Sequence, residues 1–254
     1  MRKNTITFAN GNRAVAITAP RDASAKAILD ALEIAPPRAV ILLFGGAAGL
    51  EDSRKTRLAT LFAEGVTPVA AELGALIIDG GTQSGVMAMM GEAVAQSHTT
   101  VQLLGIAPGG KITNPEIAGA SKIPEGASLE PNHSHFVLVE SNEWGGETSR
   151  MLELAHALKV PVAAILINGG AIAADEALES VRNGWPLLVF EGSGRFADEL
   201  SSAVRGHQSA RSPGITEIAR SGRVTLFHID GAPQELKNRL RRMLKHDENG
   251  SRFP

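Results

Sequence analysis

The segment from Ala75 to Val94 constrains the fold of this chain more than any other part of the sequence. Its apolar start, Ala75 to Ile78, predicts a short buried strand, and Gly80-Gly81 ends that run. Apolar residues at helical spacing follow, namely Val86, Met89, Met90, Ala93 and Val94. A strand, a glycine-rich turn and a helix in this order are typical of a doubly wound α/β sheet. Such a turn presents backbone N–H groups and a helix N-terminus to a phosphate.

Strand-length apolar runs alternate with helix-like segments along the whole chain. Strands are predicted at 39–44, 75–78, 101–106, 136–139, 160–167, 187–190 and 224–229. This alternation implies an α/β fold with a mostly parallel sheet and helices on both faces. Because a glycine cluster follows most of these strands, the clusters should meet at the carboxyl edge of the sheet. Open α/β folds bind their ligands at that edge.

The alternation has no break between separate cores, so we expect a single domain over residues 1–254. A hairpin is expected at about 5–18, and a disordered tail at about 247–254. Gly65 and Thr67-Pro68 predict that a helix is divided in two, with Thr67 as the cap of its second part.

Composition excludes several classes of function. A net charge of −2 gives no reason to expect a nucleic-acid partner. The chain has no cysteine, so disulfides, thiol nucleophiles and zinc–thiolate sites are excluded. The apolar runs are too short to cross a membrane, so no direct membrane insertion is expected, and the N-terminus does not resemble a signal peptide. We therefore expect a cytoplasmic protein.

The turn from Gly80 to Gly85 is the first candidate for contact with a diphosphate. Val86 and Met87 open the following helix, so their backbone N–H groups lack intrahelical partners. The alternative is a tight turn that needs glycine only for its backbone angles. The contacts predicted in this segment are Gly80, Gly81, Thr82, Gln83, Gly85, Val86 and Met87.

A second glycine cluster, Glu191 to Arg195, follows another apolar run. The planar fork of Arg195 suits a phosphate or a carboxylate. The alternative is a surface ion pair with Glu191, Asp198 or Glu199. Glu191 is a candidate acceptor for ribose hydroxyls. Gly192, Ser193 and Gly194 complete the predicted turn.

His133 and His135 are two residues apart and would share one side of an extended segment. A histidine pair raises the hypothesis of a metal, but the spacing offers no third ligand. We favour structural histidines, bonded to backbone and bracing the turn beneath a ligand, and predict no metal site.

The glycine motifs resemble a known superfamily. Asp79 to Met87, followed by Gly105-Ile106-Ala107-Pro108, is similar to the paired motif of the SLOG superfamily, which includes the LOG-type phosphoribohydrolases. A closer resemblance is to the N-terminal region of the melastatin-type transient receptor potential channels and its free-standing prokaryotic relatives. Its further motifs are Leu129 to Phe136, Trp144-Gly145-Gly146-Glu147, Asn168-Gly169-Gly170 and Glu191 to Asp198.

This resemblance implies a Rossmann-like fold that senses a nucleotide-derived ligand such as ADP-ribose, with no other cofactor implied. It also implies a homo-oligomer and a membrane-protein effector as partner. In the mechanism that we expect, Trp144 or the long loop near Asn114 covers the base or ribose. The other glycines expected to line the ligand site are Gly45, Gly46, Gly145, Gly146, Gly169 and Gly170.

Glu147 carries the enzymatic alternative. LOG-type hydrolases use a glutamate after a glycine turn to cleave an N-glycosidic bond, and Glu147 occupies the similar position here. The Gly-Thr and the Glu-Glu pair of that motif are missing, and an acid in the first turn of a helix is favourable without any chemistry. The hypotheses are thus a nucleotide sensor, an N-glycosidase or phosphoribohydrolase, and an interaction scaffold that binds no ligand.

Overall fold

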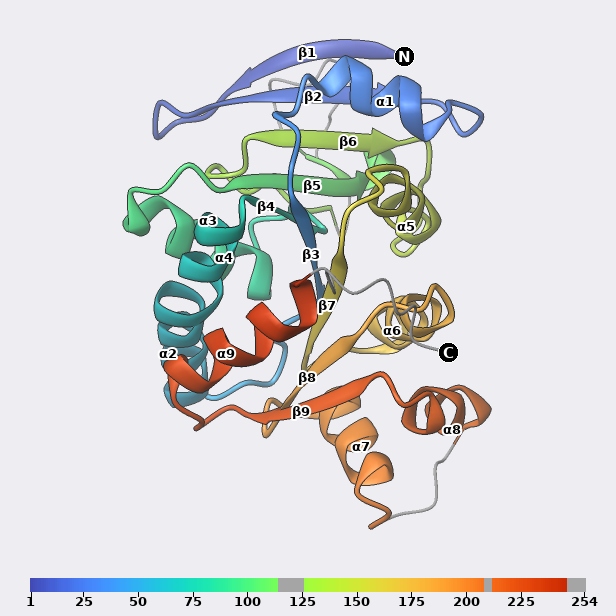
Figure 1. The fold of residues 1–254 in the computed structure, drawn as a ribbon. Coiled ribbons are helices and arrows are strands. Elements are labelled where there is room, and N and C mark those ends of the chain that lie inside the picture. Colours follow the sequence, from blue (N-terminus) through green and yellow to red (C-terminus); the bar gives the residue numbers. More distant parts are fainter. Residues whose placement is uncertain (114–125, 208–211, 246–254) are drawn as a thin grey trace.

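The computed structural model describes residues 1–113, 126–207 and 212–245. One nine-stranded sheet runs through it in the order β1-β2-β6-β5-β4-β3-β7-β8-β9 (Figure 1). All neighbouring strands are parallel except β1 and β2, which form an N-terminal hairpin. The strands are β1 Arg2–Thr7, β2 Arg13–Ala19, β3 Ala39–Gly45, β4 Ala75–Asp79, β5 Gln102–Pro108, β6 His135–Val139, β7 Val162–Ile167, β8 Leu187–Glu191 and β9 Val224–His228. The predicted disordered tail, about 247–254, and the loop near Asn114 expected to cover the ligand lie outside the described residues.

Helices cover both faces of the sheet, as Figure 1 shows. The face with α2, α3, α4 and α9 and the face with α1, α5, α6, α7 and α8 each have their own apolar core. The helices are α1 Ala25–Leu32, α2 Asp52–Leu61, η1 Phe62–Val66, α3 Thr67–Leu73, α4 Gly85–Ser97, η2 Gly109–Lys111, α5 Thr148–Ala157, α6 Ala171–Arg182, α7 Arg195–Val204, α8 Pro213–Arg220 and α9 Pro233–Leu244. The predicted α/β fold with helices on both faces is confirmed.

The central strands are buried on both sides, which explains their continuous apolar sequence. All residues of β4 and β7 are buried. Within β3, Val40 and Leu42 face one core, whereas Ile41 and Leu43 face the other. A strand that is covered on both faces needs apolar side chains at every position rather than at alternate ones.

The helix expected to divide near Gly65 continues instead. A π-helical turn, η1, joins α2 directly to α3, and the hydroxyl of Thr67 is buried with no hydrogen-bond partner, so Thr67 does not act as a cap. Gly65 serves packing: a β-carbon there would lie 2.6 Å from Cδ2 of Leu236 on α9. Gly65 therefore does not end the helix; it allows α9 to pack closely against it.

The strand order reverses at β3. The chain passes from β3 to β4, β5 and β6 in one direction, and β7 then returns to the opposite side of β3. The turns that follow β3 and β7 consequently leave the sheet edge in different directions. This is the position where open α/β sheets hold ligands.

Candidate functional site

The predicted glycine turns meet at the carboxyl edge of the sheet. A β-carbon on Gly85, after β4, would lie 3.4 Å from Cα of Gly46, after β3. A β-carbon on Gly169, after β7, would lie 3.8 Å from Cα of Gly45. Gly170 in turn touches Arg195, after β8. Residues from distant parts of the sequence thus form one continuous surface.

The turn after β4 rests on the neighbouring strand β5. A β-carbon on Gly105 would lie 2.5 Å from Cα of Gly81, and one on Gly81 would lie 2.6 Å from Cα of Gly105. The two backbones therefore approach as only glycines allow. This contact gives a physical reason for the pairing of the Gly80-Gly81 motif with the Gly105 motif in the sequence.

Only part of this turn is free to bind an anion. Gly81 N–H donates to Oδ1 of Asp79 at 2.7 Å, and Gln83 N–H donates to the carbonyl of Ser128 at 2.8 Å. The first N–H groups of α4, at Gly85, Val86 and Met87, make no hydrogen bond within the described chain. The side chain of Ser84 does not cap them either. An anion would therefore bind at the start of α4 rather than inside the turn.

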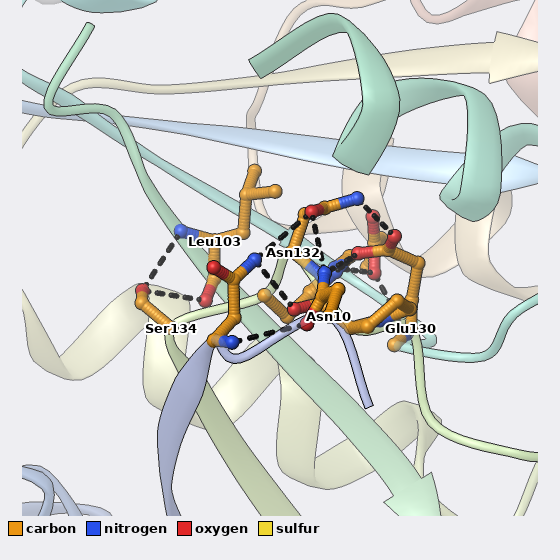
Figure 2. Close-up of polar contacts among 10 residues, drawn as sticks. Asn10, Leu103, Glu130, Asn132 and Ser134 are labelled. Atoms are coloured by element: carbon orange, nitrogen blue, oxygen red, sulfur yellow. Dashed lines mark hydrogen bonds and ion pairs between the residues drawn. The ribbon is translucent and has the colours of Figure 1, made fainter. Parts of the chain in front are cut away.

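A buried histidine lies beneath this turn. Nε2 of His133 is 2.9 Å from Oδ1 of Asp79, and its Nδ1 is 2.7 Å from Oε2 of Glu130. These carboxylates outweigh the effect of burial and raise the pKa of His133 to about 9. Asn132 extends the network, since it donates to Glu130 and accepts from Asn10 of the N-terminal hairpin (Figure 2).

The two histidines of the motif point to opposite faces of the sheet. His133 stacks on Phe136, with ring centroids 5.6 Å apart, and Phe136 belongs to the small core beneath β1 and β2. His135 alternates with Val137, which faces the other core. The residues before β6 are not extended, so the period-two expectation does not hold there. The partners of His133 are carboxylates rather than the expected backbone groups. Burial and nearby Lys3 lower the pKa of His135.

Arg195 is exposed and makes no ion pair or hydrogen bond in the described chain. A β-carbon on Gly170 would lie 2.8 Å from its Nη2, so the guanidinium covers the start of α6. The backbone of Arg195 is left-handed, at φ 47°. Strained backbone of this kind concentrates at functional sites.

Within the described residues, Arg195 forms no ion pair with the acids near it. Glu191 forms a two-pronged ion pair with Arg205, at 2.6 and 2.7 Å, which lowers the pKa of Glu191. Oδ1 of Asp198 accepts the N–H of Gly192 at 2.6 Å. Glu191 would have to release Arg205 before it could accept ribose hydroxyls.

Asn168 holds the turns after β7 and β8 together, a role that the sequence motif did not reveal. Its backbone N–H donates to Oγ of Ser193 at 2.8 Å, and its side-chain Nδ2 donates to the carbonyl of Ala48 at 3.1 Å. Its Oδ1 is buried and has no partner. The signal available in the sequence was an asparagine immediately before Gly169-Gly170, because asparagine tolerates the left-handed backbone that the structure shows there, at φ 56°.

Glu147 occupies the position before α5 without a capping side-chain hydrogen bond; it is buried, and its Oε2 has no partner. Burial raises its pKa, against a smaller opposing effect of backbone N–H groups. Glu176 of α6 is also buried, and burial together with the charge of Glu147 raises its pKa to about 8. Glu176 was not predicted as a site residue. Its position on the inward, alanine-lined face of α6 was the signal, because such faces seldom carry a charge.

The rim of the site next to Glu147 is apolar. Trp144 is half-buried, and Ile172 is one of the exposed large apolar residues of the described chain. A β-carbon on Gly145 would lie 3.3 Å from Cγ1 of Ile172, so the turn after β6 touches the start of α6. Gly146 packs against the side chain of Ser141.

A hollow of about 820 Å³ borders Gly169, Gly170 and Arg195. Residues from α6, α7 and α8 complete it, including Asp198, Glu199 and Ser212, and no residue of the β4 turn lines it. Its volume lies within the range of small-molecule sites. The hollow therefore covers the Arg195 side of the predicted site only.

In the part of the chain that the structure describes, no group of three His, Asp or Glu side chains is placed to hold a metal ion. Within the same residues, no helix has the length and apolar character needed to span a bilayer.

The prokaryotic family described as SLOG in TRPM matches residues 38–238, which include every glycine turn of the site. The chain belongs to this family. Curated relatives of the SLOG domain are channels. The transient receptor potential cation channel subfamily M member-like 2 of Nematostella vectensis is 32% identical over 204 residues, or 66% of this chain and 13% of the channel. Subfamily M member 2 of Mus musculus is 31% identical over 203 residues, again 66% and 13%. A Caenorhabditis elegans transient receptor potential channel is 30% identical over 214 residues, or 72% and 10%.

The chain thus corresponds to about a tenth of the length of these channels. The hairpin β1–β2, whose turn bonds to Asn132, precedes the segment that the SLOG family covers.

Proposed function

We propose that this protein is a binding domain that senses a nucleotide-derived ligand such as ADP-ribose. The observation that carries the proposal is Arg195, a guanidinium with no partner among the described residues, held over Gly170 at the start of α6. An unpaired arginine fork beside a helix N-terminus suits a phosphate.

A second anion position supports a ligand with a diphosphate. The N–H groups of Gly85, Val86 and Met87 are unbonded at the start of α4. The Gly85 turn touches the turn after β3, which touches Gly169 in the turn after β7. One phosphate would bind at α4 and the other at Arg195, with Trp144 covering the base or a ribose.

A thermal-shift screen tests this function. The panel is ADP-ribose, cyclic ADP-ribose, NAD, AMP and ribose 5-phosphate, and each mixture is then separated by chromatography. We expect ADP-ribose to raise the melting temperature, because a ligand that binds only the folded state stabilises it. We also expect the ligand to be recovered intact. A panel without any stabilising compound would refute this proposal in favour of a scaffold.

An N-glycosidase or phosphoribohydrolase is the second candidate. The buried Glu147, with its raised pKa and unpartnered Oε2, favours it, since burial raises the pKa of a carboxyl in the direction that a general acid requires. Release of adenine or ribose phosphate, lost in Glu147→Gln, would establish the enzyme.

The proposal includes two partners, a second copy of the chain and a membrane-protein effector, and a cytoplasmic location. These rest on family resemblance. Light scattering with and without ADP-ribose measures the assembly state, and a purely monomeric protein in both conditions would remove the first partner.

A further inference from the structure

Glu147 and Glu176 lie on two neighbouring segments at the sheet edge, the turn after β6 and helix α6. The turn that carries Glu147 touches α6, because a β-carbon on Gly145 would lie 3.3 Å from Cγ1 of Ile172. Ile172 and Glu176 are four residues apart on α6 and so lie on the same side of the helix. The charge of Glu147 contributes to the raised pKa of Glu176, in agreement with this arrangement.

Among the described residues, this buried pair has few hydrogen-bond donors beyond the backbone N–H groups of Gly145 and Glu147. Glu147 is 6% and Glu176 is 7% exposed. Oε2 of Glu147 has no partner, and the side chain of Glu176 makes no hydrogen bond or ion pair within the described chain. Nearby Asp79 also has a buried, unpartnered Oδ2. Buried polar atoms nearly always have partners, so a group that brings donors belongs here.

We propose that Glu147 and Glu176 form the subsite for a ribose of the ligand and hydrogen-bond its vicinal hydroxyls. This inference rests on the nucleotide-binding function proposed above and specifies one part of the ligand. Asp79 connects the pair to the phosphate side, because it ends β4 immediately before the turn that leads into α4. A ribose next to a phosphate is the arrangement found in every nucleotide.

The protonation of the pair fits hydroxyls better than a cation. Glu176, with its pKa raised to about 8, is mostly protonated near neutral pH. It then offers one O–H donor, while its carbonyl oxygen and Glu147 accept. A hydroxyl also both donates and accepts, so a diol matches the pair. A divalent cation would require both groups to ionise and a third ligand, and the described residues provide no such trio.

Calorimetry with ADP-ribose and with its analogues that lack the 2-hydroxyl of one or the other ribose tests the subsite. We expect one analogue to bind the unaltered protein about tenfold to a hundredfold more weakly, as for a hydrogen bond to a charged group. In Glu176→Ala and Glu147→Ala, the affinity for ADP-ribose should fall while that for the weaker-binding analogue does not. The ratio of these two affinities should therefore fall towards one. Glu176→Gln, which keeps a donor and an acceptor, should retain part of the ratio.

Arg195→Ala is the matched control, because it should weaken all three compounds equally and leave the ratio unchanged. Equal binding of ADP-ribose and both analogues by the unaltered protein overturns the ribose subsite alone, and this comparison requires no variant to fold. A ratio that persists in both alanine variants also overturns it. If the unaltered protein binds none of the compounds, the proposed function and the subsite fall together.

Discussion

Nε2 of His133 lies 2.9 Å from Oδ1 of Asp79, and the same oxygen accepts the N–H of Gly81 at 2.7 Å. A buried, charged imidazole is therefore coupled directly to the backbone of the glycine turn. Removal of one member of such a buried group leaves uncompensated charge, which is far more destabilising than the loss of an exposed ion pair.

His133→Gln should lower the free energy of unfolding by roughly 3 kcal/mol near pH 6. The pKa of His133 is raised from 6.5 to about 9 in the folded state, so its contribution is complete below about pH 6.5 and is lost as the pH rises through about 9. Urea unfolding across this range measures the decline. The unaltered protein should lose stability with rising pH, and the variant should lose less.

Glu176→Gln is the control for this pH dependence. Because the pKa of Glu176 is raised from 4.5 to about 8, this acid also makes the unaltered protein less stable as the pH rises between these values. In the control variant, the loss of stability due to Glu176 should be absent, whereas the decline with rising pH due to His133 should remain. Equal stability of the unaltered protein near pH 6 and near pH 9.5 would contradict the prediction.

Gly91→Ala should destabilise the protein although alanine favours helices. Gly91 lies within α4, and a β-carbon there would collide with the carboxylate of Glu130. That carboxylate holds His133, so any shift disturbs the network. We expect a loss of about 1–3 kcal/mol, typical of overpacking.

The matched control is Gly214→Ala in α8, where the nearest atom, Cδ2 of Leu178, would be 3.5 Å away. This substitution should be neutral or stabilising by up to about 1 kcal/mol. If both variants unfold at the same urea concentration, the packing of Glu130 against α4 does not contribute to the free energy of unfolding.

Arg195→Ala should reduce affinity for ADP-ribose about tenfold to a hundredfold and leave stability nearly unchanged. The side chain is exposed and unpaired in the described chain, so its removal breaks no internal bond. Titration calorimetry and urea unfolding measure the two quantities. Arg205→Ala, which breaks the ion pair with Glu191, is the control and should leave ADP-ribose affinity unchanged. Unaltered affinity in Arg195→Ala would remove this residue from the site.

The architecture could be predicted from the sequence because each of its strands and turns has a local sequence pattern. Strand-length apolar runs such as Ala75–Ile78, each followed by glycine, predict parallel strands whose turns share one edge. The first-turn residues Val86 and Met87 could be named for the same reason, since free N–H groups depend only on their position at the start of a helix.

The support of the site could not be read in this way. Asp79 and His133 are 54 positions apart and meet only because β4, β5 and β6 are neighbours in the sheet. The pKa of Glu176 is raised in part by the charge of Glu147, which belongs to a distant part of the sequence. At Gly65 a local rule failed, because close packing of Leu236 decided the position and not the helix-breaking tendency of glycine.

Asn132→Ala should detach the N-terminal hairpin from the site. Oδ1 of Asn132 accepts from Asn12 at 3.0 Å and from Asn10 at 3.3 Å, while its own N–H groups donate to Glu130. The variant keeps the backbone bond to Glu130 but loses the three side-chain bonds, to Asn10, Asn12 and Glu130, which should lower the free energy of unfolding by about 1–3 kcal/mol. It should also speed amide exchange at Gly81, because Glu130 holds His133 and His133 holds Asp79.

Hydrogen exchange of the unaltered protein, Asn132→Ala and Asn12→Ala separates the two effects. Asn12→Ala removes only hairpin bonds, to Asn132 and to the carbonyl of Pro131. It should speed exchange in β1 and β2 more than at Gly81. Equal exchange at Gly81 in the unaltered protein and Asn132→Ala would mean that Glu130 and His133 hold the turn without Asn132. The hairpin would then be a separate addition to the sheet edge rather than part of the support of the ligand site.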